Sequence, residues 1–140
     1  MNEPMMKKLA DQLIDHEGER LKPYLCTAGK LTIGIGRNLD DKGISQAESR
    51  ILLVNDIAEC KSDLQMLFSM WESFSPVRQI ALIDLRFNLG AGGFRSFRRM
   101  IAAIRRGDWQ GAGKEAMDSR WAVQVQKSRS GRIYAQLVGG

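Results

Sequence analysis

The sequence predicts an α+β fold in which a small β lobe accompanies a larger helical lobe. Residues 6–14 carry apolar side chains at helical spacing, residues 25–38 are β-prone and rich in glycine, and only helical patterns come after them. Elements grouped in separate blocks are typical of α+β domains. We expect a single domain over residues 1–140. Its β lobe would lie at about 20–44, the first helix and residues 45–140 would form the helical lobe, and a ligand would bind in the cleft between the lobes.

The first helix is predicted from apolar residues at 6, 9, 10, 13 and 14, which fall on one helical face. Glu17 is the next position of that face, and Gly18 provides a helix end. After it, residues 31–35 favour a strand and Ala28-Gly29 is typical of a turn, so we expect a small β-hairpin within residues 25–38. Glu17 should then face the hairpin.

Several helices are predicted after the hairpin. Ser45 and Glu48 have the spacing of a capping box, which begins a helix that we extend to about Leu67. Ser75-Pro76 has proline at the first helical position and begins the next helix. Apolar residues at 80, 82, 83 and 87 predict that this second helix is central and buried.

The remaining chain also has helical patterns. Glycines at 90, 92 and 93 should interrupt the central helix. A further helix follows, with apolar residues at 94, 97, 101 and 104 on one face, arginines on the other, and Gly107 at its end. Two shorter helices are predicted at about 109–119 and 127–138, joined by residues 120–126.

Composition limits the class of protein. With 140 residues, 44% hydrophobic and 26% charged, the chain suits one soluble globular domain. No apolar run fits a membrane span or a signal peptide, so we expect synthesis in the cytoplasm. Cys26 and Cys60 are too few for a disulfide framework and, with His16, lack metal-ligand spacing. We therefore expect no metal and no cofactor.

Positive charge is concentrated in the second half of the chain. Residues 1–70 carry 9 Lys and Arg against 11 Asp and Glu, whereas residues 71–140 carry 12 against 5. Five arginines lie close together, at 95, 98, 99, 105 and 106. Such a cluster either is a solvated helix face or attracts a polyanion, namely nucleic acid, anionic lipid or an acidic cell-wall polymer. The sequence leaves both readings open.

Glu17 is the first candidate catalytic residue. Burial on the apolar side of its helix would disfavour the carboxylate, and a partly protonated carboxyl can donate a proton to a leaving-group oxygen. A glutamate near a helix end can also simply reach water, and the register alone does not exclude this. His16 should point about 100° away from Glu17, which makes a nucleophilic pair with Cys26 improbable.

Gly34 and Gly36 interrupt the predicted second strand. Glycine weakens a strand and usually marks the close approach of another backbone or of a ligand. A third glycine would complete a dinucleotide-binding fingerprint, but position 39 is Leu39. We therefore exclude a phosphate-cradling loop here.

Several segments resemble one known family. Glu17-Gly18, Arg20-Leu21-Lys22, Tyr24 and Thr32-Ile33-Gly34-Ile35-Gly36 resemble the active-site segment of phage-type lysozymes, the endolysins of glycoside hydrolase family 24. That family has a glutamate, eight residues, an aspartate, five residues and a threonine. Glu17 and Thr32 match this spacing, and Cys26 stands where aspartate is usual. Matches in the helical lobe, at Phe87-Asn88-Leu89-Gly90, Ser119-Arg120-Trp121, Arg129 and Arg132, extend the resemblance over nearly the whole chain.

The resemblance implies a lysozyme fold and a muramidase. It implies hydrolysis of the β-1,4 bond between N-acetylmuramic acid and N-acetylglucosamine of peptidoglycan, in the cleft between the lobes. Glu17 would protonate the bridging oxygen, and Thr32 would hold a water or the reacting group. Arg129 would pair with Glu17, while Gly36 and Asn88 would support the site or bind substrate.

Cys26 departs from the family pattern and needs its own interpretation. Glycosidases commonly use a second carboxylate, which either activates water or attacks the sugar. A Cys26 thiolate could do either, whereas a neutral thiol could do less. Cys26 could also be an inert buried side chain, in which case Asp40 and Asp41 are the candidates for the second role.

We expect a peptidoglycan-cleaving enzyme used for host cell lysis, with Glu17, Cys26 and Thr32 as its catalytic residues. The alternative is a catalytically impaired lysozyme-like domain that binds an anionic cell-wall polymer or nucleic acid. The family resemblance further implies accumulation in the bacterial cytoplasm and holin-dependent release to the periplasm. The arginine-rich helix face would then contact anionic envelope polymers. We expect a monomer without a specific nucleic-acid partner.

Overall fold

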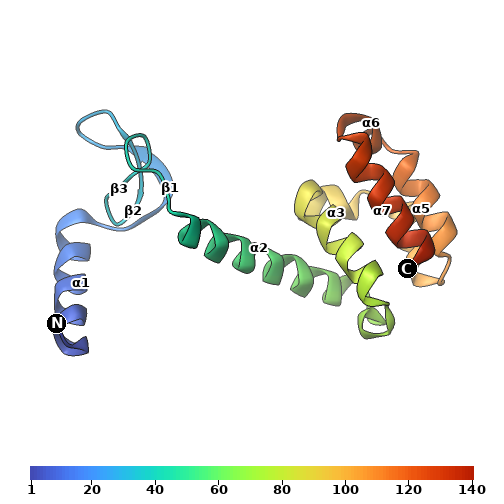
Figure 1. Ribbon diagram of the computed structural model, residues 1–140, viewed down its shortest axis with the longest axis horizontal. Coiled ribbons are helices and arrows are strands. Elements are labelled where there is room, and N and C mark those ends of the chain that lie inside the picture. Colours follow the sequence, from blue (N-terminus) through green and yellow to red (C-terminus); the bar gives the residue numbers. More distant parts are fainter. The chain divides into compact units, whose positions relative to one another are not determined.

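The computed structural model describes residues 1–140 and divides into two compact units, Met1–Ile51 and Leu52–Gly140 (Figure 1). The first unit contains a helix, all the strands and the first turn of a second helix. The second unit contains only helices. This order confirms the predicted α+β class, in which a small sheet comes before a helical region. None of the helices combines the length and apolarity that a membrane span requires.

Helix α1 (Glu3–Glu17) ends where the sequence predicts and begins earlier than its apolar pattern. The side chain of Asn2 caps its first turn by accepting a hydrogen bond of 3.0 Å from the Met5 amide. At the other end Gly18 adopts φ 72°, and its amide donates to the Ile14 carbonyl over 2.8 Å. Glycine reaches this positive φ without strain. The ending at Gly18 fixes Glu17 as the last helical residue.

The sheet has three antiparallel strands rather than the predicted two-stranded hairpin. They are β1 (Arg20–Leu25), β2 (Leu31–Gly34) and β3 (Arg37–Asn38), and β2 lies between the other two. The first strand begins at Arg20, before the predicted hairpin, and it includes Lys22-Pro23-Tyr24. Because β1 is an edge strand, it tolerates a proline that lacks a hydrogen-bond donor. The sheet thus begins directly after the end of α1.

Helix α2 (Gln46–Leu67) begins with the predicted capping box. The Glu48 amide donates to Ser45 Oγ over 3.1 Å, and the Ser45 amide donates to Glu48 Oε1 over 2.9 Å. These two bonds satisfy donors that the first turn of a helix leaves free. The predicted helix over residues 45–67 is confirmed.

The second unit packs its helices around one apolar core. A 3₁₀ turn η1 (Trp71–Ser73) comes before the helices α3 (Pro76–Arg95), α4 (Arg98–Arg105), α5 (Trp109–Met117), α6 (Arg120–Gln124) and α7 (Lys127–Gly139). The core contains large side chains that are less than 2% exposed, including Phe68, Phe94, Leu82, Leu85 and Leu137. Burial of these side chains supplies the main stabilisation of the unit.

Helix α3 is central as predicted, but its buried face differs from the expected one. Ala81, Leu82 and Leu85 are buried, whereas Ile80 and Phe87 are exposed in the second unit. Ile80 and Phe87 lie seven positions apart and therefore share the opposite helical face. Gly90 has the non-helical values φ 75° and ψ 170°, which confirms the predicted interruption of this helix.

The shorter helices differ from the prediction in one element. Residues 120–124 form α6, whereas the sequence predicted only a joining segment there. Ser119 begins α6 by accepting a hydrogen bond of 3.3 Å from the Ala122 amide. A helix of five residues is too short for its periodicity to be recognised.

Candidate active site

The carboxyl group of Glu17 lies against the turn between β2 and β3. Gly36 in that turn has φ 64°, and a Cβ atom added to it would lie 2.8 Å from Glu17 Oε2 and 3.2 Å from the carboxyl carbon. A side chain at this position would require the carboxyl to move. A Cβ at Gly34, by contrast, would meet no atom within 4 Å. The close approach predicted for the two glycines is therefore found at Gly36 alone.

Glu17 is exposed, so the structure does not show the predicted burial of its carboxyl. No residue of α1 is buried. The first unit supplies only a small sheet and the start of α2 besides α1, and these elements do not cover the helix. Any dry environment for the carboxyl must come from outside the first unit, for example from a bound sugar.

Thr32 occupies the middle of the sheet. It pairs with Tyr24 of β1 on one side and with Asn38 of β3 on the other. Its side chain is 3% exposed, and Oγ1 donates to the Lys30 carbonyl over 2.9 Å. Thr32 is the only polar residue of the first unit that is buried. A hydroxyl in this position is held rigidly by its own strand.

Cys26 follows β1 directly and begins the turn that leads to β2. Its amide donates to the Lys30 carbonyl over 2.9 Å, and the Gly29 amide donates to the Cys26 carbonyl over 2.8 Å. The backbone N–H groups of Lys30 and Ala28, and then the hydroxyl of Thr32, lower the pKa of the Cys26 thiol. Hydrogen bonds to the charged form favour that form. The turn thus makes the Cys26 thiol easier to ionise than that of a free cysteine.

Asp40 and Asp41 have structural partners in the same unit. Asp40 Oδ2 accepts a hydrogen bond of 2.7 Å from the Leu31 amide. Asp41 accepts from Lys30 Nζ over 3.2 Å and from Asn38 Nδ2 over 3.0 Å. These contacts hold the segment after β3 against the start of β2.

Arg37 and Glu48 form a link that sequence reasoning missed. Arg37 Nη1 lies 2.7 Å from Glu48 Oε2 and also donates to the Gly43 carbonyl over 3.3 Å. The hydrogen bond from Arg37, followed by those from Ser45, lowers the pKa of Glu48 to about 2. The capping box was the only sequence signal at Glu48, and nothing in the sequence pairs it with a residue eleven positions earlier. The link fixes β3 to the start of α2.

Arg129 and Asn88 lie in the second unit, where both have partners. Arg129 Nη2 and Nε donate to Asp84 Oδ1 over 2.5 and 3.0 Å. Asn88 Oδ1 accepts a hydrogen bond of 2.6 Å from Trp121 Nε1. Asp84 was missed by sequence reasoning, although its place four positions before Asn88 on α3 was a usable signal. The pairing of Arg129 with Glu17 stays a prediction.

Asp84 also lines a mostly apolar cavity of about 330 Å³ in the second unit. Its other walls come from α2 and α3, and they are Leu53, Ile57, Ile80, Ile83 and Phe87. A charged pair at the edge of an apolar cavity is a common arrangement in ligand sites, where a few polar groups orient the ligand.

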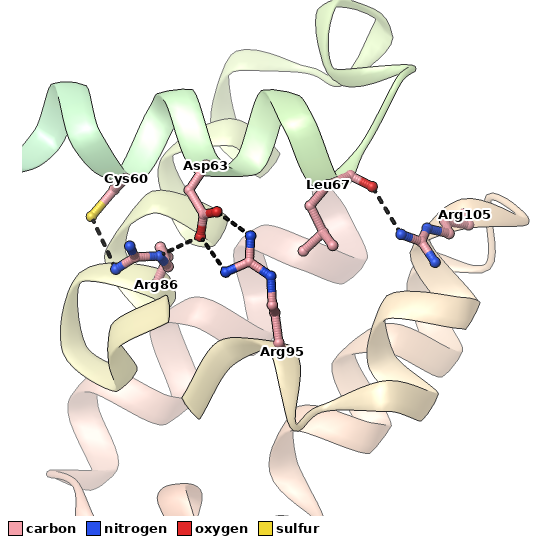
Figure 2. Close-up of polar contacts among 6 residues, drawn as sticks. All are labelled: Cys60, Asp63, Leu67, Arg86, Arg95 and Arg105. Carbon is pink, nitrogen blue, oxygen red and sulfur yellow. Dashed lines mark hydrogen bonds and ion pairs between the residues drawn. The ribbon is translucent and has the colours of Figure 1, made fainter. Parts of the chain in front are cut away.

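The five clustered arginines do not form one free helix face. Arg95 contacts both carboxylate oxygens of Asp63, and Arg105 Nη2 donates to the Leu67 carbonyl over 3.0 Å (Figure 2). Arg106 pairs with Asp108 at 3.3 Å. The arginine side chains at 95 and 105 instead turn back onto α2. Arg98 and Arg99 make no ion pair.

Comparison with known proteins decides the family. The phage lysozyme family matches residues 14–137, which is most of the chain. The chain belongs to the phage lysozyme family. This lysozyme is 31% identical to an endolysin of Acyrthosiphon pisum secondary endosymbiont phage 1, over 76% of this chain and 72% of that protein.

Two further relatives cover more of the chain. Probable T4-type lysozyme 1 of Dictyostelium discoideum is 26% identical over 97% of this chain and 96% of its own length. The pre-baseplate central spike protein Gp5 of Enterobacteria phage T4 is 29% identical over 94% of this chain, which spans 28% of the spike protein. By its family the chain is a glycoside hydrolase of the lysozyme class, and peptidoglycan is its substrate.

Proposed function

We propose that this lysozyme cleaves the β-1,4 bond between N-acetylmuramic acid and N-acetylglucosamine, with Glu17 as the general acid. The approach of the Glu17 carboxyl to Gly36 is the observation that carries the proposal. The carboxyl that we assign as the proton donor thus lies against the turn after β2, the strand of Thr32.

The reaction begins with the transfer of a proton from Glu17 to the bridging oxygen. The bond between that oxygen and the anomeric carbon breaks, and the leaving sugar departs with a new hydroxyl group. Positive charge develops on the anomeric carbon, and a thiolate at Cys26 stabilises it. Because Glu17 is exposed without substrate, the bound sugar chain must displace water from the carboxyl before it can act as an acid.

Cys26 and Thr32 assist the second half of the reaction. In one version the thiolate attacks the anomeric carbon, and water later hydrolyses the resulting thioglycoside. In the other version Thr32 and the thiolate orient a water, which adds directly and gives its proton to the sulfur. Attack by the thiolate retains the configuration of the anomeric carbon, and direct attack by water inverts it. The anomer that NMR detects first in the products distinguishes the two versions.

We further propose that residues 1–140 act as one lysozyme-like domain whose two lobes form the substrate cleft. Arg129 and Asn88 would contribute from the second lobe, with Arg129 fixing the Glu17 carboxyl. The similarity to an endolysin supports a role in host cell lysis. The protein would then accumulate in the bacterial cytoplasm and reach the periplasm with the help of a holin.

The decisive experiment measures the release of soluble products from purified peptidoglycan by wild type, E17Q and E19Q. We expect E17Q to be slower by about 100-fold or more, since loss of general acid catalysis removes a factor of that size. E19Q removes a carboxylate two residues away and should keep the wild-type rate. Wild-type activity in E17Q would exclude the acid role. Mass spectrometry should find products that have gained one water, because the anhydro products of a transglycosylase lack it.

The second candidate function is binding of an anionic cell-wall polymer or nucleic acid without hydrolysis. The observation in its favour is Cys26, which stands at the position where the family usually has aspartate. Under this alternative the wild-type protein would bind peptidoglycan or retard DNA without releasing soluble products. Release of products that depends on Glu17 would exclude it.

A further inference from the structure

A cavity lined by arginines lies where the end of α2 meets α4, and the lysozyme reaction gives it no role. Arg95, Arg98 and Arg105 line it together with Leu67 and Ile101, and its volume is about 270 Å³. Figure 2 shows Arg95 and Arg105 both directed at the last turn of α2. Arg98, Ile101 and Arg105 share one face of α4 because they occupy positions i, i+3 and i+7.

The charge around this cavity is unbalanced. Asp63 is the carboxylate that neutralises Arg95, and it also accepts a hydrogen bond of 2.8 Å from the buried Arg86. Arg98 and Arg105 have no carboxylate partner. Arg86 and Arg95 therefore share one carboxylate, while Arg98 lines a neighbouring cavity with Glu115 and Asp118 without an ion pair to either. An anion that entered the cavity would reduce the repulsion among the guanidinium groups.

Two of the lining guanidinium groups are already held in place. Arg95 is fixed by its contacts with both oxygens of Asp63, and Arg105 by its bond to the Leu67 carbonyl. A guanidinium has five N–H donors, so each group keeps donors for a ligand. Because these side chains are held before binding, less conformational entropy is lost when an anion binds.

The cavity suits a phosphate group better than a carboxylate. A carboxylate presents two oxygens in a plane, which match one guanidinium, whereas the tetrahedral phosphate can accept from several groups at once. The volume is several times the roughly 30 Å³ that one water occupies in the liquid, so part of the esterified group can enter as well. Leu67 and Ile101 offer that group an aliphatic surface.

We propose that this cavity binds the phosphate group of a phosphorylated sugar. A sugar is favoured over other phosphate esters because its C–H groups can lie against the two aliphatic side chains and because the substrate of the family is itself a carbohydrate polymer. The site would hold the enzyme on a phosphorylated glycan. All of its lining residues belong to the second unit, and the proposal does not rest on the role of Glu17.

The test titrates the intact, isotope-labelled protein with glucose 6-phosphate, inorganic phosphate and glucose, and follows backbone NMR shifts. We expect saturable shifts at Leu67 and along α4 with both phosphates, tighter binding of the sugar phosphate, and no response to glucose. R98Q should weaken binding about tenfold, because it removes one charge-assisted contact. The matched control is R99Q, which removes the same charge from the next residue of α4 and should change affinity by less than about twofold.

Equal weakening by R98Q and R99Q, or no saturable binding to the wild type, would overturn the proposal. Vesicles of phosphatidylglycerol and a DNA oligonucleotide distinguish other sources of phosphate, and we expect R98Q and R99Q to affect these two equally. A selective effect of R98Q on DNA or vesicles without one on the sugar phosphate would show that the carbohydrate assignment is wrong. R98Q should keep wild-type hydrolysis of purified peptidoglycan, and E17Q should still bind glucose 6-phosphate. The two proposals can therefore fail separately.

Discussion

At the scale of single residues, Cys26 determines how this lysozyme differs from the family pattern. Aspartate is charged at neutral pH without assistance, whereas a thiol needs its surroundings to become a thiolate. The turn after β1 provides N–H groups that lower the pKa of the Cys26 thiol. The hydroxyl of Thr32 has one proton and already donates to Lys30, so it can turn to the sulfur only by giving up that bond.

A substitution series at Cys26 tests whether the charge matters. We expect C26D to keep substantial activity, because it restores a negative charge, and both C26A and C26S to lose most of it. The ratio of wild-type to C26D activity should rise with pH as the thiol loses its proton, since aspartate is already ionised above about pH 4 and both enzymes share the same acid. Rates on purified peptidoglycan across pH measure both effects. Equal activity of all the variants would remove Cys26 from the mechanism.

A substitution at Gly36 tests whether the position of the Glu17 carboxyl matters for catalysis. An alanine there places its Cβ 2.8 Å from Glu17 Oε2, so the carboxyl must move. We expect G36A to lower the hydrolysis rate by about tenfold or more, in line with the sensitivity of catalysis to displacements of about 1 Å. G34A is the matched control. Gly34 also has a positive φ, but a Cβ added to it would meet no atom within 4 Å. If backbone strain alone matters, both variants will lose activity to the same extent.

Sequence reasoning could propose only those candidate site residues that belong to a pattern, and it missed residues whose contacts depend on folding. Glu17, Cys26 and Thr32 have a fixed spacing along the chain, and the Thr32 hydroxyl helps to lower the pKa of the Cys26 thiol, although the sheet register pairs Thr32 with Tyr24. Asp84 became a candidate only through its contact with Arg129, which lies 45 positions away. The exposure of Glu17 could not be predicted from helical periodicity, because periodicity assigns a face and says nothing of what covers it.

At the scale of elements, the Arg37–Glu48 pair joins the sheet to α2. Arg37 directly follows Gly36, so the same pair also restrains the turn against which Glu17 lies. Elements with strong local signals were predicted well, as the capping box at Ser45 shows. Strand β1 was missed because Pro23 argues against a strand unless the strand is known to lie at an edge.

The pKa of Glu48 predicts how the first unit responds to acid. This pKa is lowered to about 2, below the ordinary value of 4.5. The stabilisation by this group is therefore complete above pH 4.5 and is lost as the pH falls toward 2. The protection factors of the β2 amides, which compare the observed exchange rate with the intrinsic rate at each pH, should fall over this range in the wild type. In E48Q, where the amide still caps α2, these protection factors should be lower at neutral pH and change less with acid, and an unchanged acid response would contradict the assignment.

At the scale of the whole molecule, Asp63 connects α2 with both sides of the kink in α3. Arg86 lies before Gly90 and Arg95 lies after it, and both donate to Asp63 (Figure 2). The Arg86 and Asp63 side chains are 8% and 15% exposed, so this pair is largely shielded from water. A single carboxylate thus fixes the angle at which the two parts of α3 meet.

Removal of that carboxylate should destabilise the second unit strongly. We expect D63N to lower the free energy of unfolding by about 3 kcal/mol, because Arg86 stays buried without a counterion. D56N is the control, since Asp56 is exposed on the same helix and has no ion pair. Urea unfolding followed by circular dichroism gives both values. A similar loss in the two variants would argue against the bridging role of Asp63.

The apolar core predicts which part of the chain folds by itself. Every buried apolar side chain lies between Cys60 and Leu137, within the second unit. We expect a fragment of residues 52–140 to unfold cooperatively on heating, since it keeps this core. A fragment of residues 1–51 should show no cooperative transition in calorimetry. Cooperative unfolding of the shorter fragment would mean that its sheet and helix are stable without a buried core.

The three tryptophans, Trp71, Trp109 and Trp121, all belong to the second unit. Intrinsic tryptophan fluorescence of this enzyme therefore reports on the second unit. It gives almost no signal from the segment that carries Glu17 and Cys26. A thermal-shift assay read at tryptophan wavelengths would give an unchanged melting point for a variant whose catalytic segment had already lost its structure. A tryptophan introduced near Tyr24 would make that segment visible.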